Sequence, residues 1–166
     1  MDERLLTAFN GQIALEHASE RAYLQMAAWA DEHDFAGTAQ WLREQAAEEG
    51  YHARLFMDFV LDRGGSVRLA ALDAPRADYA DLVEVFTAAL EHEREVTAAI
   101  GSLYATAQEV ADYASLPLLT WFLNEQVEEE ATVSTILGEF RMVAGDPSAL
   151  LYLDRGLPKR RGNGDG

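Results

Sequence analysis

Four long stretches of this chain combine helix-forming composition with an apolar residue at every third or fourth position. They span about residues 2–31, 34–63, 78–109 and 115–144, and none contains a proline beyond its first turn. Such a period is typical of an amphipathic helix, and the first two would each be about 43 Å long at 1.5 Å per residue. A short connection joins the first stretch to the second, and another joins the third to the fourth. Each pair of helices is therefore expected to be antiparallel. The sequence therefore predicts an all-α protein built on an antiparallel four-helix bundle.

The starts of these helices follow from local signals. Asp2, Asp34 and Asp78 are predicted to cap the first three, because a short acidic side chain accepts hydrogen bonds from the free N–H groups of a first turn. Ser115 followed by Pro117 predicts the start of the fourth.

Two further segments complete the plan. Residues 64–78 carry glycine, proline and no helical period, yet they are long enough to travel the length of the bundle, so they predict a crossover between the second and third helices. A proline after Asp146 predicts a short fifth helix that ends near Asp154. We expect one domain over residues 1–156 and a flexible, basic and glycine-rich tail over residues 157–166.

Composition excludes several functions. The 166 residues include no cysteine, so a disulfide framework, a thiolate zinc site and an iron–sulfur centre are all ruled out. A formal net charge of -16 disfavours nucleic-acid binding and favours cations as ligands. The first residues lack a basic-then-apolar leader, and no apolar run approaches the roughly 20 residues that span a bilayer. We therefore expect no membrane contact and a cytoplasmic location.

Each of the four helices carries acid in the middle of its own apolar stripe. In the third, Glu93 continues a series that includes Phe86, Val96 and Ile100. Because burying unpaired carboxylates is costly and a cluster of them repels, the pattern indicates that cations neutralise them. Carboxylates with one imidazole suit Fe(II), and Zn(II) or Mn(II) could occupy the same ligands.

The acids and their neighbours repeat at a fixed spacing. The members are Glu16, Glu49 and His52 in the first half of the chain and Glu93, Gln126 and Glu129 in the second. In each half the first two lie 33 positions apart and the third follows three positions later. The midpoints of the outer pairs, residues 34 and 111, fall in the helix connections. Glu16 and His52 are therefore predicted to lie at one height, and so are Glu93 and Glu129, as in a metal site at the centre of a bundle.

The segments around these residues resemble the metal-binding segments of non-haem bacterial ferritins. The resemblance covers about residues 3–156 and is carried by Ala14-Leu15-Glu16, Glu48-Glu49-Gly50-Tyr51-His52, His92-Glu93 and Asn124-Glu125-Gln126-Val127-Glu128-Glu129-Glu130. The order of the segments, the crossover and the short fifth helix also match. Where a fully symmetric di-iron bundle repeats Glu-x-x-His, this chain has Gln126-Val127-Glu128-Glu129, as such ferritins tend to show.

The resemblance implies which residues bind iron. Glu16, Glu49 and His52 would hold a first iron, with Glu49 bridging to a second. Glu93 and Glu129 would complete the second position.

Other residues gain roles from the same resemblance. Gln126 would lie beside the second iron and hydrogen-bond oxygen species bound there. Tyr23 matches the tyrosine that these ferritins place next to the centre. Glu48, Glu125 and Glu128 match a third, weaker iron position.

The function that the resemblance implies is iron storage with ferroxidase activity. Fe(II) would be oxidised by O2 or H2O2 at the intrasubunit di-iron centre and deposited as ferric oxide inside a homo-oligomeric cage of twenty-four subunits. Leu151, Tyr152 and Leu153 are expected to be exposed apolar residues that the assembly covers. No haem is expected, because haem bacterioferritins carry a methionine directly after the second-helix glutamate, where this chain has Gly50.

Two related classes are the alternatives. A DNA-protecting mini-ferritin builds its iron site across a subunit interface and lacks a fifth helix, whereas residues 146–154 predict one here. A rubrerythrin-like, peroxide-reducing di-iron protein usually receives electrons through a cysteine-bound iron, and this chain has no cysteine.

Overall fold

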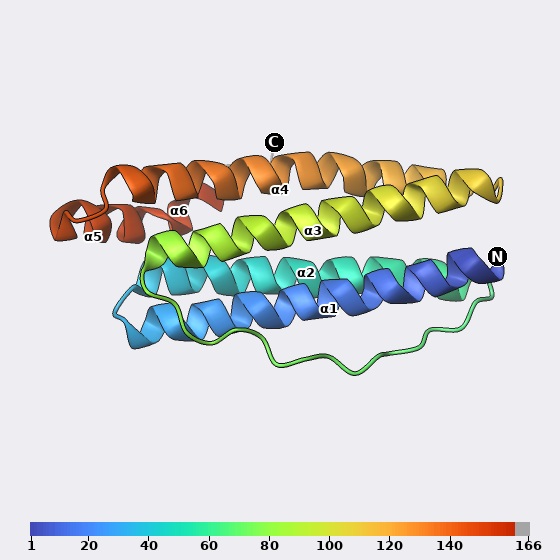
Figure 1. Cartoon of the computed structure of the whole chain (residues 1–166), viewed down its shortest axis with the longest axis horizontal. Helices are drawn as coiled ribbons and strands as arrows, with labels where there is room; N and C mark the ends of the chain where they lie inside the picture. The colour runs from blue at the N-terminus through green and yellow to red at the C-terminus, as the bar shows by residue number, and fades with distance from the viewer. Residues whose placement is uncertain (162–166) are drawn as a thin grey trace.

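The computed structural model describes residues 1–161 as four long helices packed side by side, followed by two short ones (Figure 1). The long helices are α1 (Glu3–Glu32), α2 (Ala36–Asp62), α3 (Leu82–Glu109) and α4 (Leu116–Met142). Helix α1 packs antiparallel to α2, and α3 packs antiparallel to α4. The segment between α2 and α3 runs the whole length of the bundle along α1. The predicted four-helix bundle with a long crossover is therefore confirmed.

No helix in the described part of the chain is long and apolar enough to cross a membrane.

Two of the three predicted aspartate caps were wrong. Asp2 does cap α1, since its carboxylate accepts a hydrogen bond of 2.9 Å from a backbone N–H of the first turn. Asp34 instead takes a positive φ of 66° in the turn after α1, and Phe35 occupies the N-cap position of α2 without a side-chain bond. Asp78 still belongs to the crossover, and α3 is capped by Asp81. Several candidate caps in one loop cannot be separated without knowing where the loop meets the bundle.

Two apolar clusters fill the interior of the bundle. The one near the α1–α2 turn contains Trp41 and Phe86, whose ring centroids lie 5.6 Å apart. The other, toward the opposite end, contains Phe9 and a stacked pair, Phe56 and Phe122, at 4.0 Å. All five rings are buried. The middle of the bundle, between the clusters, is occupied by polar side chains.

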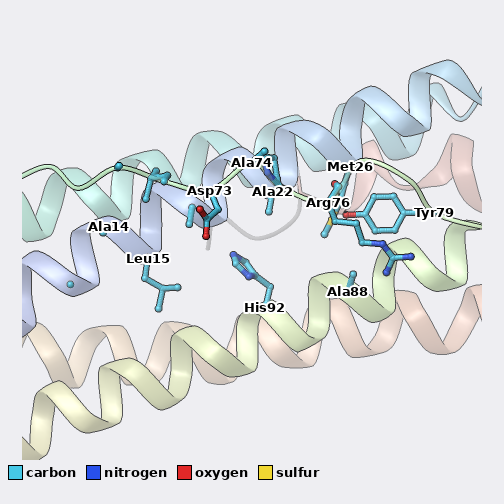
Figure 2. A pocket seen from close by; sticks show the side chains of 15 residues that line it. Ala14, Leu15, Ala22, Met26, Asp73, Ala74, Arg76, Tyr79, Ala88 and His92 are labelled. Carbon is cyan, nitrogen blue, oxygen red and sulfur yellow. Dashed lines mark hydrogen bonds between the residues drawn. The ribbon is translucent and has the colours of Figure 1, made fainter.

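The crossover leaves a cavity beneath it, between α1 and α3 (Figure 2). The cavity has a volume of about 550 Å³ and is lined along α1 by the small side chains Ala14, Ala18 and Ala22. His92 reaches into it from α3, and its buried Nε2 has no hydrogen-bond partner. Burial lowers the pKa of His92, so the imidazole is neutral at pH 7.

The fifth helix, α5 (Pro147–Gly156), is fastened to the start of α2 by one carboxylate. Asp154 is 3% exposed, and it accepts hydrogen bonds from the backbone N–H groups of Thr38 at 2.7 Å and Gly37 at 3.1 Å. A Cβ on Gly37 would lie 1.9 Å from the carbonyl oxygen of Asp154, so only glycine permits this approach. Asp154 therefore supplies the side-chain cap that α2 lacks in its own sequence.

The packing of α5 on the bundle leaves some of its apolar residues exposed and partly buries others. Leu151 is 41% exposed and Tyr152 is 81% exposed, as expected. Leu153 is partly buried against the apolar cluster near the α1–α2 turn, so the expectation that it is exposed was wrong. It lies on the face of α5 that packs on its own bundle.

Beyond α5 the chain continues along the bundle. Leu157 is buried, and a short helix, α6 (Pro158–Arg161), follows it within the segment that we expected to be a tail. Residues 162–166, where the rest of that expectation falls, lie outside the described residues. The domain boundary at residue 156 stays a prediction.

Replacing Asp154 by alanine should destabilise the bundle by about 1–2 kcal/mol, because the substitution leaves the first N–H groups of α2 without their acceptor. Thermal or urea unfolding measures the change. Ser148→Ala, at an exposed position of the same helix, is the control and should unfold as the wild type does. Equal stability of the Asp154 variant would show that the cap contributes nothing.

Candidate metal centre

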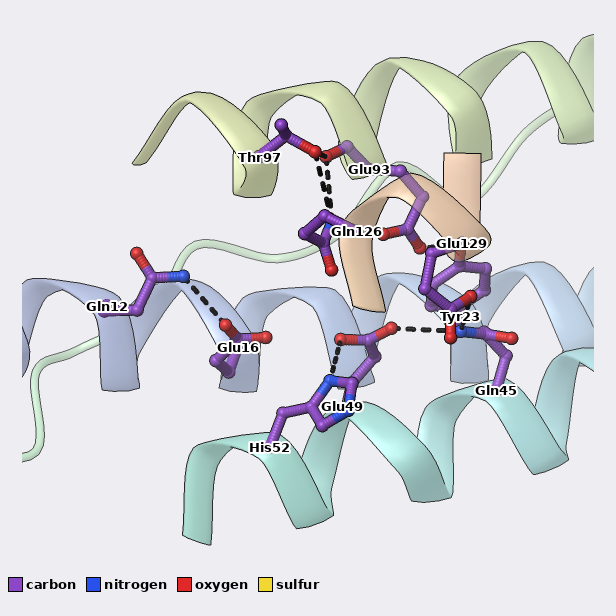
Figure 3. Close-up of polar contacts among 10 residues, drawn as sticks. All are labelled: Gln12, Glu16, Tyr23, Gln45, Glu49, His52, Glu93, Thr97, Gln126 and Glu129. Carbon is purple, nitrogen blue, oxygen red and sulfur yellow. Dashed lines mark hydrogen bonds and ion pairs between the residues drawn. The ribbon is translucent and has the colours of Figure 1, made fainter. Parts of the chain in front are cut away.

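A layer of polar side chains separates the two apolar clusters and draws on all four long helices (Figure 3). Its buried members are Gln12, Glu16, Gln45, Glu49, His52, Glu93, Gln126 and Glu129. Among the buried side chains of the described residues there is no lysine or arginine. The layer thus holds four carboxyl groups with a single imidazole as its only potential cation, which is an arrangement that needs an outside positive charge.

Glu16, Glu49 and His52 form the tightest group in this layer. Each is at most 2% exposed, and each offers a ligand atom that lies within 4.8 Å of those of the other two. The Nδ1 of His52 lies 3.5 Å from Glu49 Oε2. One oxygen of Glu16, Oε2, is buried without any hydrogen-bond partner. An unpartnered buried carboxylate oxygen beside two further donors fits a divalent cation.

The pKa shifts in this group follow from burial and from the neighbouring charge. Burial, then the charge of Glu49, raises the pKa of Glu16 well above its ordinary value. Burial by itself would lower the pKa of His52, but the hydrogen bond and charge of Glu49 outweigh it, so the pKa of His52 is raised. Both shifts have the direction expected where buried negative charge is in excess, since it favours a protonated carboxyl group and a protonated imidazole.

Glu93 sits opposite this group, between two hydrogen-bond donors. The hydroxyl of Tyr23 donates to Glu93 Oε1, and the amide of Gln126 donates to Glu93 Oε2 at 3.2 Å. Burial and the charge of Glu49 nevertheless raise the pKa of Glu93 to about 7. Burial and the charge of Glu93 raise the pKa of Tyr23 well above its usual range, so its hydroxyl keeps its proton and remains a donor.

Glu129 is tied to the first group through an amide. The Nε2 of Gln45 donates to Glu129 Oε2 at 2.8 Å and to Glu49 Oε1 at 3.2 Å. Burial, then the charges of Glu48 and Glu93, raise the pKa of Glu129 to about 8. Glu129 therefore belongs to the same buried electrostatic unit as the residues predicted to lie near it.

Two members of the layer were given no role from the sequence. Gln12 donates to Glu16 Oε1 at 2.7 Å, just as Gln45 donates to Glu49. Each amide precedes its glutamate by four residues, which is one helical turn, and the two amides are themselves 33 positions apart. The repeat that predicted the acids therefore extended to their donors, and it could have identified them.

A second group of donor atoms adjoins the first on its outer side. Glu48, His52 and Glu125 each offer a ligand atom within 4.8 Å of the others. Burial, then the charge of Glu128, raises the pKa of Glu125. Glu128 itself is exposed and lies outside this group, although the sequence predicted it as a member. His52 is shared between the two groups.

Glu20, which the sequence left without a role, lies outside both groups. Its carboxylate is 3.1 Å from the Nδ1 of His17, on the surface of α1. A Cβ on Gly50 would lie 3.0 Å from Glu20 Oε1, so this glycine leaves room for the carboxylate.

A four-helix bundle with a buried carboxylate and imidazole centre, a crossover and a short fifth helix defines a metal-binding protein of the ferritin type. Residues 6–143 match the ferritin-like domain. A bacterial non-heme ferritin of Staphylococcus aureus is 34% identical over 96% of both chains, and one of Staphylococcus epidermidis is 34% identical over 98% of both. An open-pore ferritin of the hyperthermophilic archaeon Archaeoglobus fulgidus is 38% identical, covering 95% of this chain and 96% of that one, with a TM-score of 0.93.

The chain belongs to the ferritin family. Its function is iron storage with iron oxidation at a carboxylate centre, and it works as a homo-oligomer.

The raised carboxyl pKa values predict how stability depends on pH. In the metal-free protein Glu93 and Glu129, with pKa values of about 7 and about 8, hold protons that an unfolded chain releases near 4.5. Their contribution to stability is therefore full below that value and is lost as the pH rises through 7 and 8. We expect the Tm of the metal-free protein to fall by several degrees across this range in scanning calorimetry.

The same experiment with saturating Co(II) should show a smaller fall, because a bound cation replaces the protons. A Glu93→Gln, Glu129→Gln double variant should also show a weaker pH dependence. A metal-free Tm that rises between pH 5 and 8 would contradict the assignment.

Proposed function

We propose that Glu16, Glu49 and His52 bind one Fe(II), and that Glu93 and Glu129 bind a second, with Glu49 bridging the two. The observation that carries this proposal is the unpartnered Oε2 of Glu16, which lies among buried acids in a layer without lysine or arginine. Two adjacent cations would satisfy that oxygen and replace the protons that burial holds on Glu93 and Glu129.

The proposed reaction is the oxidation of Fe(II) by O2, with H2O2 as the other candidate oxidant. Two Fe(II) ions held side by side supply two electrons together, so that O2 is reduced to the level of peroxide while both irons become Fe(III). The carboxylates stabilise Fe(III) over Fe(II) because they are hard anionic donors. Glu93 and Glu129 release their protons when the cations bind, and the ferric product hydrolyses and moves to a mineral store.

Tyr23 and Gln126 are proposed to act at this centre without binding the first iron. Tyr23 orients Glu93 through its hydrogen bond to Oε1. Gln126 lies against the other oxygen of Glu93, at 3.2 Å. Both side chains are at most 1% exposed, so they also keep water away from the second position.

The proposed assembly is a closed shell of twenty-four subunits. Apolar side chains on the outside of the isolated chain support a large contact surface: Leu24, Leu61, Met142 and Tyr152 are 46%, 54%, 80% and 81% exposed. The cytoplasmic location expected from the sequence stays a prediction.

The arrangement favours a ferritin over the two related classes. The group of Glu16, Glu49 and His52 comes from α1 and α2 of one chain, whereas a mini-ferritin site needs residues of a second subunit. A rubrerythrin-like protein usually needs a cysteine-bound iron, and the sequence has no cysteine.

Replacing Glu16 or His52 by alanine should slow aerobic Fe(II) oxidation by about 10- to 100-fold or more, because each change removes a donor to the first iron. Stopped-flow absorbance measures the rate, and circular dichroism checks that the helices remain. Glu91→Ala, which removes an exposed glutamate two positions before Glu93, is the matched control and should oxidise Fe(II) at the wild-type rate. Wild-type rates in both site variants would rule out the proposed centre.

We also propose a third, weaker cation position with Glu48 and Glu125 as ligands, to which the neighbouring Glu128 adds negative charge. It is supported by the proximity of Glu48 and Glu125 to His52 and by the greater solvent exposure of these acids, which weakens binding. Replacing all three by alanine should abolish the weakest of three binding steps in an anaerobic Fe(II) titration and leave the two tighter ones. Unchanged stoichiometry, or loss of every site in a folded protein, would refute this position.

A further inference from the structure

The cavity beneath the crossover is a space that the proposed iron centre does not use. Its volume of about 550 Å³ lies within the range of sites that bind small organic molecules. Its lining is mainly apolar, with Ala18, Ala22 and Met26 on α1 and Ala88 on α3. A Cβ on Gly11, which also lines it, would have no heavy atom within 4 Å, so the space is open at that end as well.

Side chains at both ends of the crossover hold it over this space. At the start of the crossover, Asn10 on α1 donates to the backbone carbonyl of Ser66 at 3.1 Å and accepts from the backbone N–H of Arg68. Near its end, the guanidinium of Arg76 forms an ion pair with Glu84 on α3. The crossover is thus fastened to α1 and to α3, and the cavity between them is a fixed feature of the fold.

His92 presents an unsatisfied polar atom to this lining. Its Nε2 is buried and has no hydrogen-bond partner among the described residues, and Figure 2 shows the ring reaching into the cavity from α3. A buried polar atom without a partner costs free energy, which a bound group recovers if it supplies the missing hydrogen bond. Nε2 donates when it carries hydrogen and accepts when it does not, and a hydroxyl group complements either form.

The other polar groups of the lining disfavour a charged ligand. Asp73 lines the cavity from the crossover, in a chain of formal net charge -16, and its carboxylate would repel an anion. The guanidinium of Arg76 is already paired with Glu84, and the hydroxyl of Tyr79 donates to the backbone carbonyl of Arg76 at 3.2 Å. A cation would lose its hydration without gaining a buried carboxylate, because Asp73 is exposed.

We propose that the cavity beneath the crossover is a binding site for a small, uncharged and largely apolar molecule with one hydroxyl group, which forms a hydrogen bond with Nε2 of His92. The apolar part of such a molecule would cover the alanine side chains of α1 and α3 and gain the free energy of leaving water. The site is separate from the proposed iron centre, so its test needs no iron.

Three probes with one ring system test this proposal: 2-naphthol, naphthalene, which lacks the hydroxyl, and 2-naphthoate, which is an anion. Equilibrium dialysis against the assembled wild-type protein at pH 7 gives their affinities. We expect one 2-naphthol per subunit and binding of 2-naphthoate about 10-fold or more weaker. In His92→Leu the affinity for 2-naphthol relative to naphthalene should fall by about 2- to 10-fold, the effect of one hydrogen bond, while naphthalene still binds.

Two further variants locate the probes. His17→Leu is the matched control, because it removes an imidazole that is 3.1 Å from Glu20 and lines a smaller neighbouring hollow. It should keep the wild-type ratio of the two affinities. Ala18→Phe places a large side chain in the cavity itself and should abolish binding of both 2-naphthol and naphthalene.

Four results would overturn the proposal. If the wild type binds neither 2-naphthol nor naphthalene, the cavity holds only water or is covered in the assembly. An unchanged affinity ratio in His92→Leu would show that Nε2 makes no bond to the hydroxyl. An equal fall in His17→Leu would place the probes in the neighbouring hollow, and undiminished binding to a folded Ala18→Phe variant would place them elsewhere on the protein.

Discussion

The free energy of removing carboxylates from water is the constraint on which the rest of this structure depends. Four acids in one layer can be held there only if something neutralises them. In the metal-free protein protons do so, as the raised pKa values of Glu16, Glu93 and Glu129 indicate. The apolar clusters on either side of the layer make the helices rigid enough to hold the acids together. At the proposed centre, cation binding would exchange these protons for metal.

The heights of the expected ligands could be predicted from the sequence because helix geometry converts spacing along the chain into position along an axis. Glu16 and His52 lie equidistant from the α1–α2 turn, and the structure brings their donor atoms within 4.8 Å of each other. The crossover could also be predicted from the sequence. The segment contains glycine and proline, lacks a helical period and is long enough to span the bundle. The ligand roles themselves stay predictions.

Contacts between elements distant in sequence could not be read in the same way. Asp154 caps α2 by accepting from the N–H of Thr38, 116 residues earlier in the chain, and nothing local to α2 predicts this acceptor. Gln45 lies on the buried face of α2, and its hydrogen bond to Glu129 depends on the position of α4 beside it. Thr97 likewise has an ordinary position on α3 until Glu130 faces it. In each case the pairing depends on how far one helix is rotated about its own axis relative to its neighbour. The apolar period shows which broad face of a helix is buried, but it does not fix this rotation.

The carboxylate of Asp154 has a consequence for how subunits meet. Because it fastens α5 to the start of its own α2, each chain presents the outer face of α5, with Tyr152, in a single orientation before any partner arrives. The conformational entropy of ordering α5 is lost when the chain folds, so association does not have to oppose it. In the proposed shell this would apply at every equivalent contact that includes α5. A single buried hydrogen-bonded side chain thus makes the subunit a preorganised building block.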